Sequence, residues 1–417
     1  MALTLSGTNG VVGAGFTLDP SGTSVTAGVG TFSSARVGAA VTISESGIEA
    51  SGIGITCANI NGTQIGGRRN IVINGAMNVA QRGTSFSGTA QQYTLDRMQM
   101  NTAGNDEIAQ TSQASVTSGG AYNSGFRNCL KITNGDQTSV GTSDVVHLKM
   151  VLEAQDIAKS GWNYTSSSSF VTLSFWIKSS VAQDFTITLR SEDGTRQVYN
   201  MKTGSLTADT WTKVTKTIPG NSNLQFDDNV NAGLTLFINA FVGTDLTTTG
   251  LTQNAWSEWS SAKQGDDMTN TWYDTNNATL EITGIQLEVG SQATPFEHRS
   301  FGEELQLCKR YYHLWVEGTN QFVCFGDFYT STQTDGGVQL PVEMRTTPSI
   351  EANTGSNYYI IYTNSTQSYI DGGLTIFRAH SRAVLWYATA DTGRTAGHSN
   401  RWVTANSDAK IAFNAEL

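Results

Sequence analysis

The stretch "GIQLEVGSQATPFEHRSFGEELQLCKRYYH", residues 284–313, decides how this chain is divided. It opens as a strand, in which apolar and polar residues alternate, and a proline then interrupts it. Ser300 followed by Glu303 is the capping-box pattern that begins a helix. The apolar face of that helix is predicted to consist of Leu305, Cys308, Tyr312 and Trp315. The sequence therefore predicts that a β-domain ends here and that a short helical connector, residues 298–316, follows it.

The sequence predicts a jelly-roll β-sandwich for residues 67–297, which precede the connector. Three segments alternate with period two, "VTLSFWIKSS", "DFTITLR" and "GLTLFINAFVG". Their inward residues are predicted to be Val171, Leu173, Phe175, Ile177, Phe185, Ile187, Leu189, Leu234, Leu236 and Ile238. One or two helical turns are expected near residues 152–161. In the last strand the apolar parity shifts after Ile282, which predicts a β-bulge at Gly284 and Ile285.

Residues 317–417, after the connector, predict a β-sandwich tip domain. Its expected strands are "YYIIYT", "LTIFRA", "AVLWYATA" and the terminal "KIAFNAEL". The last of these places apolar residues on one face up to the final residue, so the terminus is expected to be part of the structure. The fold class predicted for the whole chain is all-β.

Residues 1–66 differ from the rest in having no Lys, Trp or Tyr and only one arginine, Arg36. Such a segment buries too little apolar surface to offset the entropy of its own ordering. It is either a disordered leader or a segment that folds by intertwining with its own copies or by docking on a larger assembly. The alternating "VTISESGIEASGIGIT" favours the second alternative, because three narrow apolar stripes around one axis would form a β-prism-like trimer.

Composition excludes several classes of function. With a net charge of -10 and a pI near 5.0, the chain lacks the basic patch that nucleic-acid binding requires. No window approaches the ~20 apolar residues of a membrane helix, and the first residues do not resemble a signal peptide, so folding in a cytoplasm is expected. The cysteines Cys57, Cys129, Cys308 and Cys324 have no metal-ligand spacing. They are predicted to be buried thiols, with a bridge between Cys308 and Cys324 as the alternative.

Four segments carry a resemblance to bacteriophage fibre and receptor-binding proteins. They are "NIVINGAMNVAQRGTSF" to "YTLDRM" at 70–98, the stretch 152–180, the order LEVG, TPFE, GEEL and CKRYY within 284–312, and the closing "IAFNAEL". The similarity covers roughly residues 68–417. The segment "VTISESGIEASGI" resembles shaft repeats in fibres of phages that infect cyanobacteria and other marine bacteria.

The resemblance implies a homotrimeric virion protein, assembled in the cytoplasm of a bacterial host. Residues 1–66 would join other virion proteins of the tail or capsid, the jelly roll would be similar to carbohydrate-binding modules, and the distal tip would contact host-surface glycans. The short N-terminal region leaves the place of attachment open, and the alternative to a tail fibre is a capsid-decorating or head fibre protein. A further alternative is a tip enzyme that degrades host polysaccharide.

Glycan recognition requires flat aromatic faces beside planar polar side chains, and two clusters qualify by composition. The tip cluster consists of Tyr358, Tyr359, Tyr369, Arg394, Asn400, Arg401 and Trp402. The sandwich cluster consists of Trp256, Trp259 and Trp272. For each residue the alternative is a place in the core or in a subunit interface. The tip is favoured, because loops on a rigid scaffold tolerate variation.

Catalysis and metal binding have weaker support in the sequence. A glycosidase would need two carboxylates across a cleft, and the candidates are Asp227, Asp228, Asp266, Asp267 and Glu288. The Asp pairs lie in turn-like sequence, so no enzyme is predicted. The five histidines form no metal-binding pattern, and His298 with Arg299 is expected to fix the connector. No cofactor is predicted, apart from one possible structural calcium held by Glu288 and carbonyl oxygens of residues 74–78.

Overall fold

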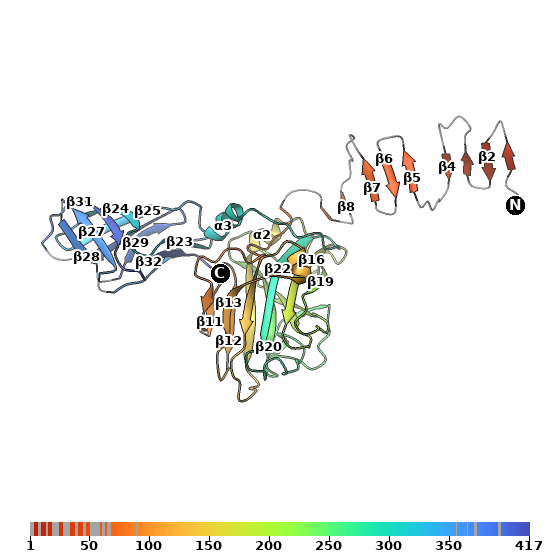
Figure 1. Ribbon diagram of the computed structural model, residues 1–417, viewed down its shortest axis with the longest axis horizontal. Helices are drawn as coiled ribbons and strands as arrows, with labels where there is room; N and C mark the ends of the chain where they lie inside the picture. Colours follow the sequence, from red (N-terminus) through yellow and green to blue (C-terminus); the bar gives the residue numbers. More distant parts are fainter. Residues whose placement is uncertain are drawn as a thin grey trace. The chain divides into compact units, whose positions relative to one another are not determined.

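The computed structural model describes residues 68–88, 90–355, 357–364, 366–370, 373–390 and 393–417 in full, and within residues 1–67 only the backbone of short strands. The chain separates into two compact units, Met1–Ala58 and Asn59–Leu417. The strands of the first 67 residues pair with their neighbours in antiparallel fashion (Figure 1). They are β1 (Thr4–Ser6), β2 (Gly10–Gly13), β3 (Phe16–Leu18), β4 (Val25–Ala27), β5 (Ser34–Val37), β6 (Val41–Ser44), β7 (Gly47–Ala50), β8 (Asn59–Ile60) and β9 (Thr63–Gln64). The predicted apolar stripe and Cys57 lie outside the fully described residues.

The sandwich consists of two antiparallel sheets between which the chain crosses repeatedly, as in a jelly roll (Figure 1). The six-stranded sheet has the order β10 (Ser85–Phe86), β13 (Gln110–Ser115), β14 (Asn128–Thr133), β22 (Thr279–Val289), β16 (Phe170–Ser179), β19 (Thr212–Pro219). The seven-stranded sheet has the order β11 (Gln91–Tyr93), β12 (Gln99–Ala103), β15 (Val145–Glu153), β20 (Ala232–Val242), β17 (Thr186–Ser191), β18 (Gln197–Lys202), β21 (Trp256–Glu258). All ten residues predicted to face inward lie in the core between these sheets.

The predicted β-bulge in the last sandwich strand is confirmed. Ser174 pairs with Gln286, and Trp176 pairs with Thr283, so Gly284 and Ile285 together oppose a single residue of β16. Gly284 has φ +66°, the left-handed conformation that glycine adopts most easily in such bulges. The extra residue returns Ile285 to the core, where it is fully buried.

The helices are few and short. They are α1 (Gly119–Asn123), α2 (Ala154–Ala158), α3 (Phe301–Lys309) and the 3-10 turn η1 (Ser261–Lys263). α2 confirms the helical turn expected near residues 152–161, and the capping box of Ser300 and Glu303 begins α3 as predicted. The predicted extent of the connector was wrong, since Tyr312 and Trp315 lie in the strand that follows α3. The spacing of Leu305, Cys308, Tyr312 and Trp315 is compatible with one long helix. It is equally compatible with a helix that is followed by a strand. No helix in the described part of the chain is long and apolar enough to cross a membrane.

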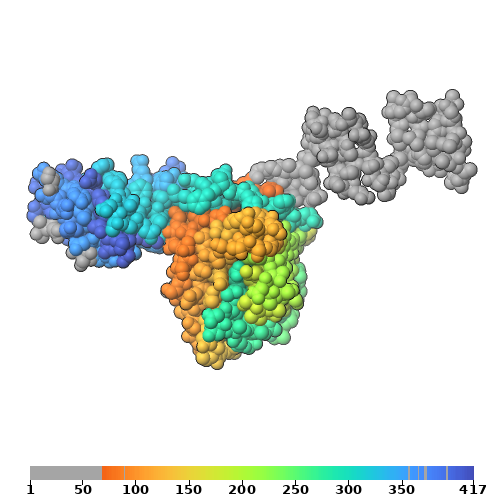
Figure 2. Space-filling model, in the orientation of Figure 1, coloured from red at the N-terminus to blue at the C-terminus, as the bar shows by residue number. Residues whose placement is uncertain are grey.

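The tip domain packs a three-stranded sheet against a seven-stranded sheet, and appears as a compact blue body in the space-filling view (Figure 2). The smaller sheet has the order β23 (Tyr312–Glu317), β32 (Lys410–Asn414), β26 (Ser349–Ala352). The larger has the order β28 (Thr366–Ile370), β27 (Tyr359–Thr363), β31 (Ser399–Thr404), β24 (Phe322–Phe328), β25 (Gln333–Gln339), β30 (Ala383–Thr389), β29 (Thr375–His380). Trp386 lies at the centre of the core, with ring centroids 6.2 Å from Trp402 and 6.1 Å from Phe413.

Buried polar contacts join the sandwich to the tip. Glu153, at the end of β15, accepts hydrogen bonds from Arg310 Nε at 2.7 Å and from Tyr311 Oη at 2.6 Å. Burial alone would raise the pKa of the Glu153 carboxyl. The hydrogen bonds from Arg310 and Tyr311 lower this pKa by more than burial raises it, so the net shift is downward. The terminal residues also take part, because Glu416 pairs with Arg97 and with Arg82 of the sandwich. The expectation of a structural C-terminus is therefore confirmed.

Arg299 fixes the connector, as expected. Its guanidinium lies 3.3 Å from carboxylate oxygens of both Glu297 and Glu304. The described cysteines are free buried thiols, which removes the bridge between Cys308 and Cys324. Burial raises the pKa of Cys324 to about 12.

Candidate functional site

The outer face of the seven-stranded sheet of the tip carries exposed aromatic rings. In β24 a register shift between Phe322 and Cys324 interrupts the alternation, so that Val323 and Phe328 enter the core while Phe322 and Phe325 point outward. Phe325 is 74% exposed and Phe322 is 49% exposed, and their ring centroids are 5.0 Å apart. Of nine exposed large apolar side chains among the described residues, five lie in the tip domain. Exposure of this kind in one domain marks a binding surface.

The strand register extends this surface across the sheet. One cross-strand row consists of Tyr369, Ile360, Val403 and Phe322, and the next consists of Gln367, Tyr362, Arg401 and Phe325. On the other side of β24, Leu385 pairs with Gly337, and Tyr387 lies with its ring centroid 6.2 Å from that of Phe377. We call this surface the tip face and define it by Phe322, Phe325, Tyr362, Tyr369, Phe377, Leu385, Tyr387 and Arg401.

Charged and amide side chains are interleaved with the rings of the tip face. The Arg401 guanidinium lies 5.0 Å from the centroid of the Tyr362 ring and is exposed. Asp327 pairs with Asp335 across β24 and β25, and Asp327 is exposed. Gln367 is exposed beside Tyr362. Four neighbouring strands at their usual spacing give each row a length of about 14 Å.

This arrangement suits a polyhydroxylated ligand that lies flat on the sheet. Aromatic faces pack against apolar C–H surfaces, while guanidinium, amide and carboxylate groups can each make two hydrogen bonds to neighbouring hydroxyls. Because the rings sit on paired strands rather than on loops, their positions are fixed before any ligand arrives. A preformed surface loses less entropy when it binds.

The structure divides the predicted tip cluster. Tyr369 and Arg401 belong to the tip face. Arg394 is half-buried and donates hydrogen bonds to Thr366 and Gln367 on the neighbouring strand β28. Tyr358 is half-buried against the core. The remaining three, Tyr359, Asn400 and Trp402, are buried and present no surface to a ligand, so the core alternative holds for them.

The predicted sandwich cluster does not form a common surface. Trp272 is fully buried, and its indole donates to the carbonyl oxygen of Thr279 at 3.1 Å. Trp256 packs on Tyr199 with centroids 5.1 Å apart. Only Trp259 reaches the outer face of the seven-stranded sandwich sheet, where Arg190 lies 5.3 Å from its ring.

That outer face of the sandwich sheet is covered by the chain itself. Asn239 and Thr188 point away from the core, and both donate hydrogen bonds to the carbonyl oxygen of Gln264, at 3.1 Å and 2.7 Å. Phe237, on the same face, is only 9% exposed. The cavity between Phe237, Trp259 and their neighbours measures about 10 Å³, enough for one water molecule at most. A sugar ring cannot enter.

Glu288 has a structural environment. It is fully buried, and its two carboxylate oxygens accept hydrogen bonds from the Thr294 backbone at 2.8 Å, from Thr294 Oγ1 at 2.6 Å and from Gln286 at 2.8 Å. A calcium ion at Glu288 would have to displace these donors. Among the described residues no three His, Cys, Asp or Glu side chains are grouped as a metal site.

The carboxylates weighed for catalysis are engaged with their neighbours. Asp228 pairs with Lys159 at 2.7 Å, and Asp266 pairs with Lys202 at 2.9 Å. Asp267 accepts from Thr249 Oγ1 at 2.6 Å. Asp227 accepts from Gln225 at 3.1 Å.

Sequence reasoning missed most of the tip face, including Phe322, Phe325, Tyr362, Leu385 and Tyr387. Alternation in "QFVCFGDFY" could not show it, because strict period two places Phe322 and Phe325 on opposite faces. A register shift between Phe322 and Cys324 turns both rings outward. Aromatic residues on both faces of one strand did not show which face would be covered. The pairing of β24 between β31 and β25 decides that.

Comparisons with known proteins return similarities of fold only. No family model matches the chain, and no curated protein matches its sequence. Among solved structures, the enzymatically active domain of tailspike protein 4 of bacteriophage CBA120 matches at 8% identity and TM-score 0.28, over 53% of this chain and 21% of that one. The chain thus spans about a fifth of that domain.

Two sugar-binding proteins give similar matches. A putative sugar binding protein of Bacteroides thetaiotaomicron matches at 10% identity and TM-score 0.27, over 53% of this chain and 99% of that one. The family 11 carbohydrate-binding module of Clostridium thermocellum, in complex with a mixed-linked tetrasaccharide, matches at 15% identity and TM-score 0.23. The match covers 51% of this chain and 97% of that one. At these values the similarities establish neither a ligand nor an activity for this chain.

Proposed function

We propose that this chain is a non-enzymatic fibre protein of a phage virion, which binds host-surface glycans through its tip face. The observation that carries the proposal is the row of exposed rings interleaved with Arg401 and Gln367 on paired strands. The homotrimer and the attachment of residues 1–66 to other virion proteins rest on the sequence.

The mixed chemistry of the tip face favours a glycan over a second subunit. The centre of a permanent subunit interface is depleted of acidic residues and is dry. The tip face instead places exposed Asp327 and Arg401 on strand β24 and its neighbour β31, beside Phe325. Sugar hydroxyls can use those groups without the desolvation cost that a protein surface would incur.

A weak site on each chain would be sufficient. Three copies on one axis, and several fibres on one particle, raise the overall avidity by ~10²- to 10⁴-fold without any new contact. A millimolar affinity for a single sugar row would still hold a cell surface.

The test compares two kinds of exposed phenylalanine. We expect the double variant Phe322→Ala/Phe325→Ala to lose at least ~5-fold in retention on immobilised host polysaccharide, because removal of two ring faces costs ~1 to 3 kcal/mol. Phe301, 59% exposed on α3, provides the matched control, and Phe301→Ala should bind like the unmodified protein. Equal retention of all three proteins would reject the tip face as the glycan site.

Mass measurement of the same proteins separates a glycan site from a subunit interface. The unmodified protein and both variants should contain three chains. If the double variant alone dissociates into monomers, the tip face is a contact between copies and the proposal fails.

The N-terminal segment and the absence of catalysis have their own tests. Deletion of residues 1–66 should leave a soluble sandwich and tip that no longer join particles, and retained incorporation would reject that assignment. Copy number distinguishes a tail fibre, at a few tens of chains per particle, from a capsid-decorating protein, at hundreds. New reducing ends after incubation with host polysaccharide would instead identify a degrading enzyme.

A further inference from the structure

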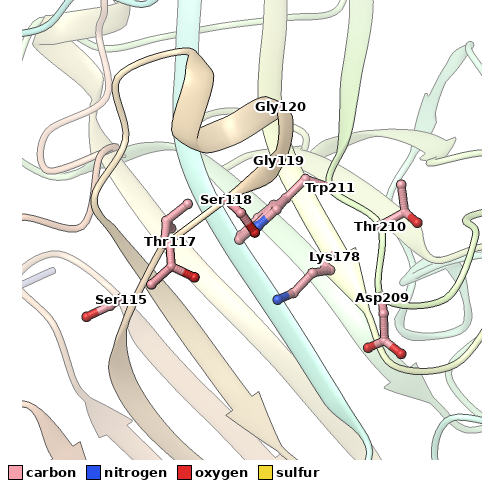
Figure 3. Close-up of a pocket in the computed structure, with 10 residues that line it drawn as sticks. Ser115, Thr117, Ser118, Gly119, Gly120, Lys178, Asp209, Thr210 and Trp211 are labelled. Atoms are coloured by element: carbon pink, nitrogen blue, oxygen red, sulfur yellow. The ribbon is translucent and has the colours of Figure 1, made fainter.

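A pocket opens on the outer face of the six-stranded sandwich sheet, over β16 and beside the edge strand β19. It encloses about 220 Å³ and is lined by ten residues. Figure 3 shows Lys178, which rises from β16, between two segments of the chain. One segment runs from Ser115 to Gly120 and the other from Asp209 to Trp211.

The walls of this pocket are held by the backbone. The amide of Asp209 donates to the carbonyl oxygen of Ser179 at 2.7 Å, and the amide of Val116 donates to that of Arg127 at 2.8 Å. Gly119 has φ +84°, and a Cβ there would lie 3.0 Å from Cδ1 of Trp211. The glycine therefore lets the first wall approach the indole closely, and the pocket exists before a ligand binds.

Several polar groups of the pocket have no partner in the protein. Within the described residues, the side chains of Ser115, Thr117, Ser118 and Asp209 take part in no hydrogen bond or ion pair. Ser118 is the N-cap residue of α1 but makes no capping bond with its side chain. Asp209 has φ +56°, an uncommon conformation for a residue other than glycine and one that clusters at functional sites. Hydroxyls and a carboxylate thus remain available to a ligand.

Charge and shape indicate the class of ligand. The Lys178 ammonium lies 2.9 Å from Glu281 and 5.3 Å from the Trp211 ring, so its charge is balanced within the protein. Asp209 is the carboxylate that lines the pocket, and it leaves the site with an unbalanced negative charge. An indole, a positioned ammonium and four unpartnered polar side chains suit one sugar ring, whereas a carboxylated sugar would be repelled.

We infer that this pocket binds a single neutral pyranose, such as the terminal residue of a host glycan. The inference extends the proposed role in glycan binding, but it concerns a separate site on the sandwich. Trp211 would pack against the ring of the sugar, Asp209 and Lys178 would bind adjacent hydroxyls, and Ser118 would bind at the opposite edge.

The test uses the full-length protein with ¹⁵N-labelled tryptophan. Methyl β-glucopyranoside, methyl β-galactopyranoside and N-acetylglucosamine are titrated to millimolar concentrations, with glucuronate as the charged counterpart. The indole resonance of Trp211 is assigned by its absence in Trp211→Phe. We expect at least one neutral sugar to shift this resonance, and glucuronate to bind more weakly.

The variant Asp209→Asn/Ser118→Ala removes the charge and one hydroxyl. Both residues are exposed, neither makes a side-chain bond in the fold, and asparagine accepts the left-handed conformation. Affinity for the responding sugar should fall about tenfold, the loss expected for two weakened hydrogen bonds. No shift with any neutral sugar, undiminished affinity in the variant, or equal affinity for glucuronate would each overturn the inference.

The Phe322→Ala/Phe325→Ala protein separates this inference from the proposed function. It should show the same sugar-dependent shift of Trp211 as the unmodified protein, whether or not it still binds polysaccharide. Loss of the shift in that variant would mean that the sugar binds elsewhere and would also overturn the inference.

Discussion

The sandwich and the tip domain each contain a seven-stranded antiparallel sheet whose outer face carries aromatic rings and arginine. In the sandwich, Phe237 and Arg190 lie beside each other, with the guanidinium 5.1 Å from the ring centroid. In the tip, Arg401 lies 5.0 Å from the Tyr362 ring. Both rings lie on the outer face of their sheet, but Phe237 is 9% exposed and Phe325 is 74% exposed.

The difference arises from the connections rather than from the strands. Between β20 and β22 the sandwich has a long segment, residues 243–278, part of which folds back over its own sheet through Gln264 and Trp259. The connection from β24 to β25 in the tip is four residues, 329–332, and cannot reach back over the sheet. The same pattern of rings therefore serves stability in one domain and remains available for binding in the other.

The strongest way to test this comparison is to truncate one ring on each face. Phe237→Ala should lower the free energy of unfolding of the sandwich by about 4 kcal/mol, because it leaves a cavity under the covering segment. Phe325→Ala should change the free energy of unfolding by less than ~0.5 kcal/mol, as for other exposed positions. Urea denaturation followed by tryptophan fluorescence measures both. Similar losses would mean that the tip face is also covered, for instance by another copy of the chain.

The covered face of the sandwich sheet, unlike the tip face, should make the stability of its domain depend on pH. Burial, with smaller effects of Lys149 and Arg190, lowers the pKa of His147 to about 3, whereas an unfolded histidine titrates near 6.5. The folded state thus keeps His147 neutral, and the unfolded state gains the proton first as the pH falls. Stability from this residue is complete above pH ~6.5 and is lost progressively between ~6.5 and 3.

The variant His147→Gln isolates that contribution. Between pH 6.5 and 4 the unmodified protein should lose about 3 kcal/mol more than the variant, at up to ~1.4 kcal/mol per pH unit. His313, whose pKa burial lowers to about 4, remains in both proteins and cancels. Denaturation midpoints at several pH values give the comparison, and parallel profiles would show that His147 is accessible to protons in the folded state.

Truncation of Trp259, which covers the sandwich sheet, should lower the stability less than truncation of Phe237 beneath it. Trp259→Ala deletes a ring that lies 5.3 Å from Arg190 and 5.8 Å from Arg196, and should cost about 1 kcal/mol. Scanning calorimetry should show a decrease of about 2 to 4 °C in the sandwich transition. Phe377→Ala on the tip face is the control and should leave this transition in place. If Trp259→Ala lowered the stability more than Phe237→Ala does, our assignment of Trp259 as the covering residue and of Phe237 as the residue beneath it would be wrong.

The smallest expected effect concerns the cation of the tip face. Arg401→Gln should weaken polysaccharide retention about threefold, since an exposed cation–ring pair contributes only ~0.5 to 1 kcal/mol. Arg401→Lys keeps the charge and should retain part of the binding. Retention columns run at low and high salt provide the measurement. A loss as large as that of the double phenylalanine variant would mean that the ligand is bound by charge rather than by ring faces.

Local patterns were sufficient for much of the fold. Strict alternation in residues 171–177 identified the core face of β16, because period two allows only one face to be apolar. A single shift of parity located the bulge at Gly284, and a serine three residues before a glutamate located the start of α3. These features depend on neighbours within a few positions, which a sequence displays directly.

The candidate site was less predictable. Composition identified the tip and, within it, Tyr369 and Arg401, but assigned Trp402 and Tyr359 to the surface although they are buried. A tryptophan or tyrosine in a Gly- and Asn-rich segment is read as a loop residue when its strand partners are unknown. Burial depends on which sheet a strand joins.

The sequence alone determined that this chain is built of strands, where their inward faces lie and where the helical connector begins, because each follows from the periodicity of the backbone. Only the tertiary structure decided which outward rings stay open to solvent. That outcome depends on long-range pairing, which aligned β28, β27, β31 and β24 into rows, and on whether a distant segment such as that around Gln264 folds back to cover them.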